Sequence, residues 1–292
     1  MGKRDVVTWT TMLGGYAQRG YYEEAVRIFQ EMLQGGEVQP NEATLVNVLH
    51  VCALLGDLSL GKWVHSYMDG RLDVVKDGNV GNALMNMYAK CGEMGMTLKV
   101  FNELKRKDLF SWSIGIGGMA MNGYGKQSLE LFSLMLCHGI VPDGITFISL
   151  LSACSHAGLI DKGLVFFKAM QDTYGITPEL GHYACMVDMY GRAGLLVEAE
   201  AFMKNMPVEP DQTVLGALVN ACKLHGNEKI LENVSRRLVG ASGVGGGTYT
   251  LLSNMYSNFK RWTEAYHLRD IMGCIGVRKA PGCSRVDASD LR

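Results

Sequence analysis

Apolar and polar side chains alternate through residues 109–143 with the period of two amphipathic helices. The first helix is predicted over residues 110–121 and the second over residues 127–137. The apolar side chains of the second helix fall on one face: Leu129, Phe132, Met135 and Leu136. A Gly-Tyr-Gly turn at 123–125 separates the helices, and His138-Gly139 ends the second one. This stretch is therefore predicted to be a helix–turn–helix unit.

The same pattern recurs along the chain. A shift of 102 residues places Pro40-Asn41 on Pro142-Asp143, and it keeps many later positions in step. The further matches include Thr44-Leu45 on Thr146-Phe147, Cys52 on Cys154, Gly61 on Gly163 and Met87-Tyr88 on Met189-Tyr190. A shift of 103 residues places Trp9 on Trp112 and Phe29 on Phe132. This self-similarity indicates a repeat protein, because chance does not hold so many positions in register.

Each long period divides into three shorter units. Their starts are placed at Val6, Glu42, Gly78, Leu109, Gly144 and Leu180, and two related units begin at Gln212 and Gly247. One helix pair cannot bury its apolar face alone, so neighbouring units must stack. The predicted fold is an all-α solenoid of about eight helix–turn–helix repeats.

Composition narrows the possible functions. Apolar residues make up 48% of the 292 residues and charged residues 20%, which suits a packed domain. The formal net charge of −1 provides no strong non-specific attraction for phosphates, so a nucleic-acid partner must be held by base contacts and local patches. No apolar run approaches the ~20 residues of a membrane span. The eight cysteines include no Cys-x-x-Cys pair, and we expect most of them to be small buried hydrophobic residues.

The beginning of the chain gives a further expectation. Patterned sequence follows directly after Met1-Gly2-Lys3, with no secretory signal or transit segment. We therefore expect residues 1–5 to be the remnant of a truncated, longer array.

Two motifs that enzymes use do not fit this sequence. Residues 110–120 contain glycines that imitate a dinucleotide-binding fingerprint, but the repeat register places them on a helix. A zinc-dependent nucleobase deaminase needs His-x-Glu and Cys-x-x-Cys, and none of the seven histidines has Glu two residues later. The chain is predicted to be no enzyme and to need no metal or cofactor. Glycines at 240–247 are expected to form a linker.

The motifs themselves resemble a known family, the plant pentatricopeptide repeat proteins. The unit lengths resemble those of its P, L and S motifs, and so do the amino-acid sequences at residues 6–12, 81–92, 108–113 and 150–159. By this resemblance the units are P 6–41, L 42–77, S 78–108, P 109–143, L 144–179 and S 180–211. Residues 212–284 resemble the E-type extension, with two degenerate repeats, and residues 285–292 are a tail. Departures from the family pattern are Leu215 in place of Trp, and Gly115 inside a helix.

The resemblance implies a right-handed superhelix that binds single-stranded RNA in a mitochondrion or chloroplast. The E-type extension implies site recognition for conversion of cytidine to uridine. Since the deaminase domain of the family is absent from this sequence, the resemblance implies a deaminase-bearing partner protein in trans. It implies no membrane partner.

In this family the fifth and last residues of a repeat read one base. The resemblance therefore implies three reading pairs: Thr10 with Asn41 for adenine, Asn82 with Asp108 for uracil, and Ser113 with Asp143 for guanine. It also implies that Val7, Asn79 and Phe110 clamp the faces of the bases. Ala184 with Asp211 would be a weak reader. The L-type pairs, Val46 with Asp77 and Ile148 with Glu179, would read nothing, because an aliphatic side chain cannot hydrogen-bond a base. The implied footprint is A-n-U-G-n-n.

Plainer interpretations stay open. Asn41, Asp108, Asp143 and Asp211 each precede a predicted helix, where Asn and Asp are ordinary N-caps. Their partners at the fifth position could be merely solvated. The whole surface could instead bind a peptide, as in a helical protein–protein interaction scaffold of the tetratricopeptide kind.

Overall fold

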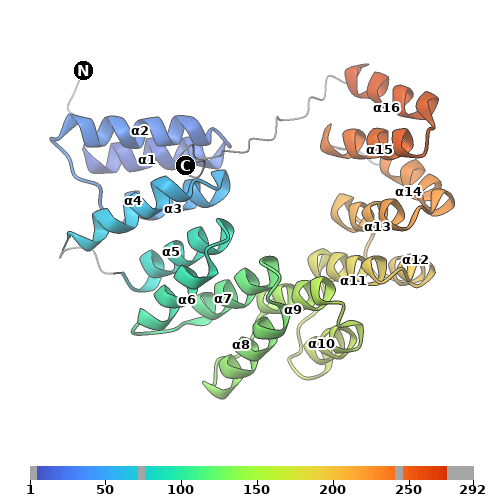
Figure 1. Ribbon diagram of the computed structural model, residues 1–292, viewed down its shortest axis with the longest axis horizontal. Coiled ribbons are helices and arrows are strands. Elements are labelled where there is room, and N and C mark those ends of the chain that lie inside the picture. The colour runs from blue at the N-terminus through green and yellow to red at the C-terminus, as the bar shows by residue number, and fades with distance from the viewer. Residues whose placement is uncertain (1–4, 72–75, 241–245, 275–292) are drawn as a thin grey trace, which may run out of the picture. The chain divides into compact units, whose positions relative to one another are not determined.

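The computed structural model describes residues 5–71, 76–240 and 246–274, and within these ranges it contains sixteen helices and no strand (Figure 1). The helices are α1 Val6–Gln18, α2 Tyr22–Gly35, α3 Glu42–Leu55, α4 Leu58–Asp69, α5 Gly78–Lys90, α6 Met94–Glu103, α7 Leu109–Met121, α8 Gly125–Cys137, α9 Gly144–Ala157, α10 Ile160–Asp172, α11 Leu180–Arg192, α12 Leu196–Lys204, α13 Gln212–His225, α14 Glu228–Gly240, α15 Gly246–Asn258 and α16 Trp262–Cys274. The predicted all-α repeat fold is confirmed.

The first helices of the units begin where the sequence pattern placed the unit starts. Seven of the eight odd-numbered helices start at the expected residue, and α15 starts at Gly246 instead of Gly247. Within a unit the two helices pack on each other, as α1 does on α2 and α5 on α6. The first helices of successive units also pack together, as α3 does on α5 and α11 on α13.

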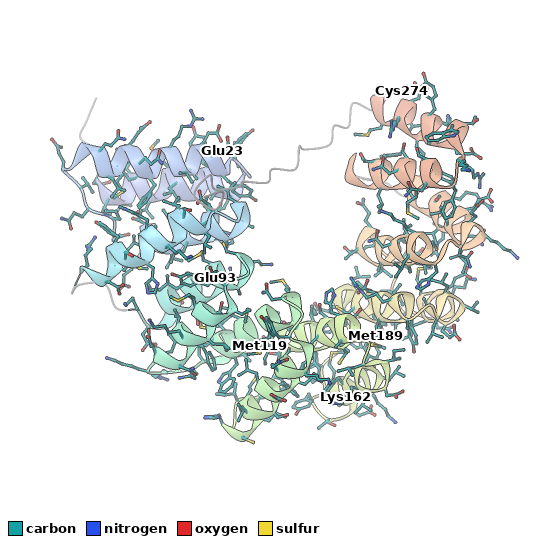
Figure 2. All side chains as sticks on the ribbon, in the orientation of Figure 1. Glu23, Glu93, Met119, Lys162, Met189 and Cys274 are labelled. Carbon is teal, nitrogen blue, oxygen red and sulfur yellow. The ribbon has the colours of Figure 1, made fainter. Side chains whose placement is uncertain are left out.

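The helices form two compact bodies. The N-terminal body comprises the described residues up to 122 together with residues 130–141, and the C-terminal body comprises residues 123–129 and the described residues from 142 to 274. Each body buries apolar side chains between its helices, and in the C-terminal body one continuous cluster of them extends from Tyr183 to Leu268. Figure 2 shows the side chains on the ribbon.

The repeat of the sequence is also a repeat of packing. Leu45, Val48, Leu49 and Cys52 are buried on α3, and their counterparts Phe147, Leu150, Leu151 and Cys154 are buried on α9. A Cβ atom added at Gly61 would lie 2.4 Å from the sulfur of Met87, and one at Gly163 would lie 2.3 Å from the sulfur of Met189. Close helix approach therefore accounts for glycine at both positions.

Both ends of the first helices follow from local chemistry. Side-chain oxygens of the residues before them accept hydrogen bonds from backbone N–H groups of the first turn, in α1, α3, α7, α9 and α13. Each such N-cap stabilises a helix by ~1 kcal/mol. At the other end, Gly56 and Gly158 both take a φ of 67°, the left-handed conformation that glycine adopts without a steric penalty.

The cysteine prediction was right in part. Cys52, Cys154 and Cys222 are buried, and burial raises the pKa of the Cys52 thiol to about 12. Cys137 and Cys274, by contrast, are exposed where their helices end, and Figure 2 labels Cys274. Cys283 lies outside the described residues.

The glycine-rich stretches of the chain differ in how well they were predicted. The glycines at 115–118 lie on α7, as the repeat register predicted, and a Cβ at Gly115 would meet Leu131 at 2.9 Å. The linker prediction was wrong at its edges, because position 240 belongs to α14 and positions 246 and 247 belong to α15. The rest of that predicted linker, residues 241–245, lies outside the described residues.

Candidate RNA interface

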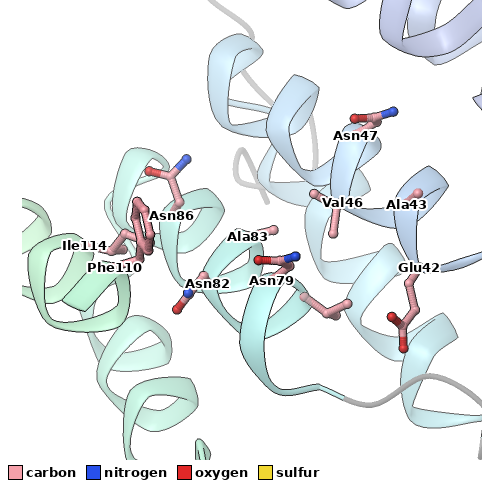
Figure 3. A pocket seen from close by; sticks show the side chains of 11 residues that line it. Glu42, Ala43, Val46, Asn47, Asn79, Asn82, Ala83, Asn86, Phe110 and Ile114 are labelled. Carbon is pink, nitrogen blue, oxygen red and sulfur yellow. The ribbon is translucent and has the colours of Figure 1, made fainter. Parts of the chain in front are cut away.

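An open hollow of about 580 Å³ lies on the first helices of the N-terminal body (Figure 3). Helices α3, α5 and α7 form its walls. It is lined by Glu42, Ala43, Val46, Asn47, Asn79, Val80, Asn82, Ala83, Asn86, Phe110 and Ile114. The predicted reading residue Asn82 thus shares one hollow with two of the predicted clamp residues, Asn79 and Phe110.

The two side chains of the uracil pair are in hydrogen-bond contact. Asn82 is buried on α5, and its Nδ2 donates to Oδ1 of Asp108, the N-cap of α7, over 3.3 Å. The Ser111 hydroxyl lies 2.8 Å from Oδ1 of Asn82 and 2.8 Å from Oδ1 of Asp108. The expected pairing of the fifth and last residues of this unit is therefore a direct contact.

Asp108 stays ionised in this arrangement. Partial desolvation works to raise its pKa, but hydrogen bonds from the Ser111 backbone and hydroxyl and from Asn82 outweigh that effect. The pKa of Asp108 is consequently below its ordinary value. At neutral pH the group is an acceptor only.

The adenine pair is joined through a third residue. Thr10 Oγ1 lies 2.6 Å from Thr44 Oγ1, and the Thr44 hydroxyl lies 2.8 Å from Oδ1 of Asn41. Thr10 also donates to the carbonyl of Val6 over 2.8 Å. Asn41 is the N-cap of α3, where its Oδ1 accepts from the backbone N–H of Thr44 over 2.9 Å.

The members of the third pair lie in different bodies. Ser113 is buried on α7. Asp143 is the N-cap of α9, and its Oδ1 accepts from the backbone N–H and from the hydroxyl of Thr146, each over 2.8 Å. The possibility that Thr10, Asn82 and Ser113 are merely solvated is wrong for Asn82 and Ser113, which are buried, and for Thr10, which is half-buried and hydrogen-bonded.

The capping interpretation is confirmed at all four positions where it was raised. Asp211 accepts from the backbone N–H groups of Thr213 and Val214, each over 3.0 Å, and Asn41, Asp108 and Asp143 make the equivalent bond. Capping uses one oxygen of each side chain. It leaves the amide nitrogen of Asn41, or the second carboxylate oxygen of each Asp, for another partner.

The units that should read nothing have a different local chemistry. Val46 lines the hollow with an aliphatic side chain, and Asp77 makes no capping bond. In the second L-type unit, His182 Nδ1 accepts from the backbone N–H of Glu179 over 3.0 Å, and its Nε2 lies 2.8 Å from the carbonyl of Gly144. A base edge finds no hydrogen-bonding side chain at the fifth position of either unit.

The three clamp residues are all exposed near the start of a first helix. Val7 on α1 and Phe110 on α7 each have 64% of their surface exposed, and Asn79 is exposed on α5. Asn79 and Phe110 stand on neighbouring helices of the hollow (Figure 3). A planar base can stack between side chains placed in this way.

Sequence reasoning missed the hydroxyl at the third residue of the following unit. Thr44, Ser111 and Thr146 occupy this position, and each hydrogen-bonds to the preceding N-cap side chain. The signal was present, because a hydroxyl three residues after an Asn or Asp N-cap has the spacing of a capping box. The 102-residue shift also places Thr44 on Thr146.

Among the described residues, no group of three or more His, Cys, Asp and Glu side chains is placed to hold a metal ion. Within the same part of the chain, no helix is long and apolar enough to cross a bilayer.

Comparison with family models places known motifs over most of the chain. A model for the PPR repeat matches residues 82–109, 110–140, 145–172 and 182–209, a model for the PPR repeat family matches residues 4–53, and a model for the E motif matches residues 225–287.

The chain is also similar to named proteins of Arabidopsis thaliana. It is 42% identical over 289 residues to a chloroplastic pentatricopeptide repeat-containing protein and 39% identical over 287 residues to the chloroplastic pentatricopeptide repeat-containing protein DOT4. It is 37% identical over 285 residues to a mitochondrial pentatricopeptide repeat-containing protein. These matches cover 99%, 98% and 98% of this chain. The chain spans only 39%, 33% and 45% of the length of these relatives.

Among solved structures, the fold is similar to the pentatricopeptide repeat protein PPR10 in complex with an 18-nt psaJ RNA element. The TM-score is 0.68 and the identity 22%, over 94% of this chain and 41% of that one. A crystal structure of PPR10 from maize gives a TM-score of 0.63 at 23% identity, over 94% of this chain and 40% of that one. Repeat models, E motif, relatives and fold agree, and the chain belongs to the pentatricopeptide repeat family, in the class whose repeats are followed by an E motif.

Proposed function

We propose that the chain binds single-stranded RNA and reads selected bases with the fifth and last residues of its P- and S-type units. The observation that carries this proposal is the hollow that brings Asn79, Asn82 and Phe110 together beside Asp108. The PPR10 structure in complex with RNA supports it at the level of the fold.

The chemistry of the hollow suits uracil. The Watson–Crick edge of uracil offers the N3–H donor and a neighbouring carbonyl acceptor. The ionised Asp108 accepts from N3–H, and the Asn82 amide donates to the carbonyl. The base would stack between Phe110 and Asn79. A peptide can also enter such a hollow, but an exposed ring face beside an acceptor and a donor is the combination that a single planar base uses.

The wider role follows from the E motif and the relatives. We propose that the chain helps specify sites for conversion of cytidine to uridine, and that a deaminase-bearing protein is recruited in trans through residues 212–284. The E-motif match over residues 225–287 supports this step. Relatives named as chloroplastic or mitochondrial support a role in one of these organelles.

The experiment is a gel-shift titration of the purified chain against A-n-U-G-n-n. Three further strands each have one specified base replaced, and a strand with only unspecified bases replaced is the matched control. Loss of one base's hydrogen bonds weakens binding by about fivefold to tenfold. We expect each of the three replacements to weaken binding, and the control strand to bind like the original.

Two outcomes contradict the proposal in different ways. If the chain binds every strand equally, it binds RNA without reading it. If it binds no strand at low salt, the helical surface serves a peptide or protein, and the scaffold function takes its place.

A further inference from the structure

From α3 to α13, the third residue of the first helix varies with the unit before it. It is a hydroxyl residue directly after each unit with a polar reading pair: Thr44, Ser111 and Thr146. It lacks a hydroxyl after each of these units whose fifth residue is apolar: Val80, His182 and Val214. Between α3 and α13 the hydroxyl therefore accompanies the proposed reading pairs.

The structure gives these hydroxyls a position between the two reading side chains. Thr44 is fully buried, and its Oγ1 contacts both Thr10 and Asn41. Ser111 is buried, and its Oγ contacts both Asn82 and Asp108. In the two reading units whose pairs lie wholly in the N-terminal body, one buried hydroxyl connects the fifth residue to the last.

At the first pair, the backbone and the hydroxyl of Thr44 have separate roles. The backbone N–H can only donate, so the Asn41 atom that faces it is the oxygen, and the amide nitrogen is turned away as a donor. The hydroxyl contacts both Asn41 and Thr10 and holds them in place. Thr10 gives its one hydroxyl proton either to Thr44 or to the carbonyl of Val6, and in both cases it keeps a lone pair that can accept a hydrogen bond.

The first pair therefore presents an acceptor beside a donor. Adenine offers the complementary edge, with the N6 amino group as donor and N1 as acceptor. Uracil offers the opposite polarity. The arrangement thus provides a physical reason for the adenine preference expected of Thr10 with Asn41.

The second pair has the opposite polarity. Asp108 can only accept, so the Asn82 atom that faces it is the amide nitrogen, a donor. The Ser111 hydroxyl contacts the amide oxygen of Asn82 on the other side and holds the side chain in this orientation. Oδ1 of Asp108 is occupied by Ser111 and Asn82, so Oδ2 is the acceptor that remains for a base. A donor beside an acceptor is complementary to uracil.

We propose that Thr44 and Ser111 are positioning residues for base specificity, because each buried hydroxyl holds the fifth and the last residue of the preceding unit in one hydrogen-bonded arrangement. This inference rests on the proposed RNA-reading function. By register, Thr146 has the same role toward Asp143. Neither hydroxyl touches the base itself.

The chain contains its own control for the test. Val80 occupies the same position on α5 as Thr44 does on α3, and it is buried there without disturbing the helix. Within the described residues, Oδ1 of the preceding Asp77 is then buried without a hydrogen-bond partner. A valine is thus compatible with the fold, and its effect is on the last residue of the preceding unit.

The experiment compares wild type, Thr44→Val, Thr44→Ser and Ser111→Ala on four strands that differ only at the first specified base, and on four that differ only at the third position. We expect Thr44→Val to reduce the preference for adenine at the first base by about threefold to tenfold, the contribution of one hydrogen bond, and to leave the preference for uracil at the third base unchanged. Ser111→Ala should reduce the preference for uracil at the third base and leave the preference for adenine at the first base unchanged. Thr44→Ser should restore the adenine preference, because it keeps the hydroxyl.

The outcomes separate this inference from the proposed function. If wild type is selective and a folded Thr44→Val chain keeps the same adenine preference, the positioning role is wrong and base reading stands. If Thr44→Val weakens binding equally for all strands, the hydroxyl only supports the fold, and the inference is again wrong. If wild type binds no strand, the proposed function fails and this inference fails with it.

A second hollow, in the C-terminal body, independently indicates a further site. It measures about 710 Å³ and lies on α13, α15 and α16. It is lined by Lys223, Asn254, Ser257, Asn258, Trp262, Ala265, Tyr266 and Arg269. Trp262 and Tyr266 stand one helical turn apart with 65% and 74% of their surfaces exposed.

The charge of this lining favours a nucleic acid. It contains two cations and no carboxylate, in a chain whose formal net charge is −1. Arg269 is held in place because its Nε donates to the Ser253 hydroxyl over 2.8 Å and its Nη2 donates to Oδ1 of Asn254 over 3.3 Å. Exposed aromatic rings beside a fixed guanidinium are typical of sites that stack bases and hold phosphates.

We infer that this hollow binds one or two nucleotides of the same RNA strand outside the bases that the repeats read, without base selectivity. This inference also rests on RNA binding by the chain. Trp262 and Tyr266 would stack the bases, and Lys223 and Arg269 would contact the phosphates.

The test uses A-n-U-G-n-n alone and with mixed-sequence tails of about 4–16 nucleotides at either end, the range that single-strand-binding modules cover. We expect a tail at one end to tighten binding to wild type by about fivefold to a hundredfold, as stacking of one base does. Trp262→Ala/Tyr266→Ala should lose this gain and bind the short strand like wild type. Tyr124→Ala removes another exposed aromatic ring and should keep the gain.

A gain that persists in the double variant, or a tail that brings no gain to wild type, overturns this second inference. Either result would assign the exposed rings to a protein partner. Binding of the short strand by the same samples shows separately whether the proposed RNA function holds.

Discussion

The first two units of the chain have the same backbone and opposite local chemistry. Both begin with a first helix that is capped by a side chain, and both bury aliphatic side chains between neighbouring helices. In the first unit Thr10, Asn41 and Thr44 form one hydrogen-bonded group. In the second unit Val46 is aliphatic, and Oδ1 of Asp77 has no partner among the described residues.

This difference separates the residues that make the fold from those that make the site. The apolar positions recur in every unit, because each helix pair must bury its face against the next. The polar group occurs only in some units and adds little to the core. Binding selectivity can therefore vary from unit to unit while the scaffold stays constant.

The largest expected effect is a loss of stability when the core is truncated, in both kinds of unit. Leu49 in an L-type unit and Ile116 in a P-type unit occupy the same register position, and both are fully buried. Substitution of either by alanine should lower the free energy of unfolding by about 2–5 kcal/mol, because it leaves a cavity. Urea denaturation measures this loss.

Base preference provides the control for these core variants. At a temperature where both chains remain folded, neither should change which base is preferred at any position. A core variant that remains folded but changes base preference would contradict the separation of scaffold from site.

The second prediction converts a silent unit into a reading one. Val46→Asn with Val80→Ser gives the second unit the same three side-chain types as Asn82, Asp108 and Ser111. We expect a new preference for uracil at the second base of the footprint, of about threefold to tenfold, because one or two hydrogen bonds are added. Strands that differ only at that base measure the effect.

The matched control is Val46→Asn alone. Without the hydroxyl of Val80→Ser, the new amide should give a smaller preference. Equal preference in both variants would show that the connecting hydroxyl contributes nothing.

These predictions also show how much the sequence could provide. The starts of the first helices follow from the register, which the sequence displays directly. The proposed reading residues follow from that register together with the family resemblance. The contact between Thr10 and Thr44 joins residues 34 positions apart on neighbouring helices, so it depends on packing that no local pattern encodes. Burial of Ser113 and exposure of Cys137 depend in the same way on where each helix face points.

A third prediction concerns cysteine chemistry. Cys137 and Cys274 are exposed, while burial raises the pKa of Cys185 to about 12 and that of Cys154 to about 11. A thiol with a raised pKa holds little thiolate at neutral pH, and thiolate is the reactive form. Mass spectrometry after brief alkylation at pH 7.5 should therefore find modification at Cys137 and Cys274 before Cys154 and Cys185. Early modification of Cys154 or Cys185 would contradict the packing of the first helices.

The smallest expected effect is a dependence on pH at Asp108. Its folded pKa is depressed, so its contribution to stability is present above its unfolded pKa and is lost as pH falls through the folded value. Between pH 5 and pH 8 this group should cause no change in stability or uracil preference. Below about pH 4, the ordinary value for an aspartate, both should decline.

Asp108→Asn tests this assignment. The variant has no carboxylate to titrate, so its uracil preference should be weak and independent of pH in the same range. A wild-type preference that changes between pH 5 and pH 8 would require a different titrating group.

The measurement that tests the central claim most directly exchanges one reading pair. Wild type and Thr10→Asn/Asn41→Asp are titrated against A-n-U-G-n-n and against the same strand with its first base changed from A to U. If the pair reads the base, wild type binds the A strand more tightly and the variant binds the U strand more tightly. If both proteins bind the two strands with the same preference, these residues act only as helix caps and packing groups, and the account of base reading is wrong.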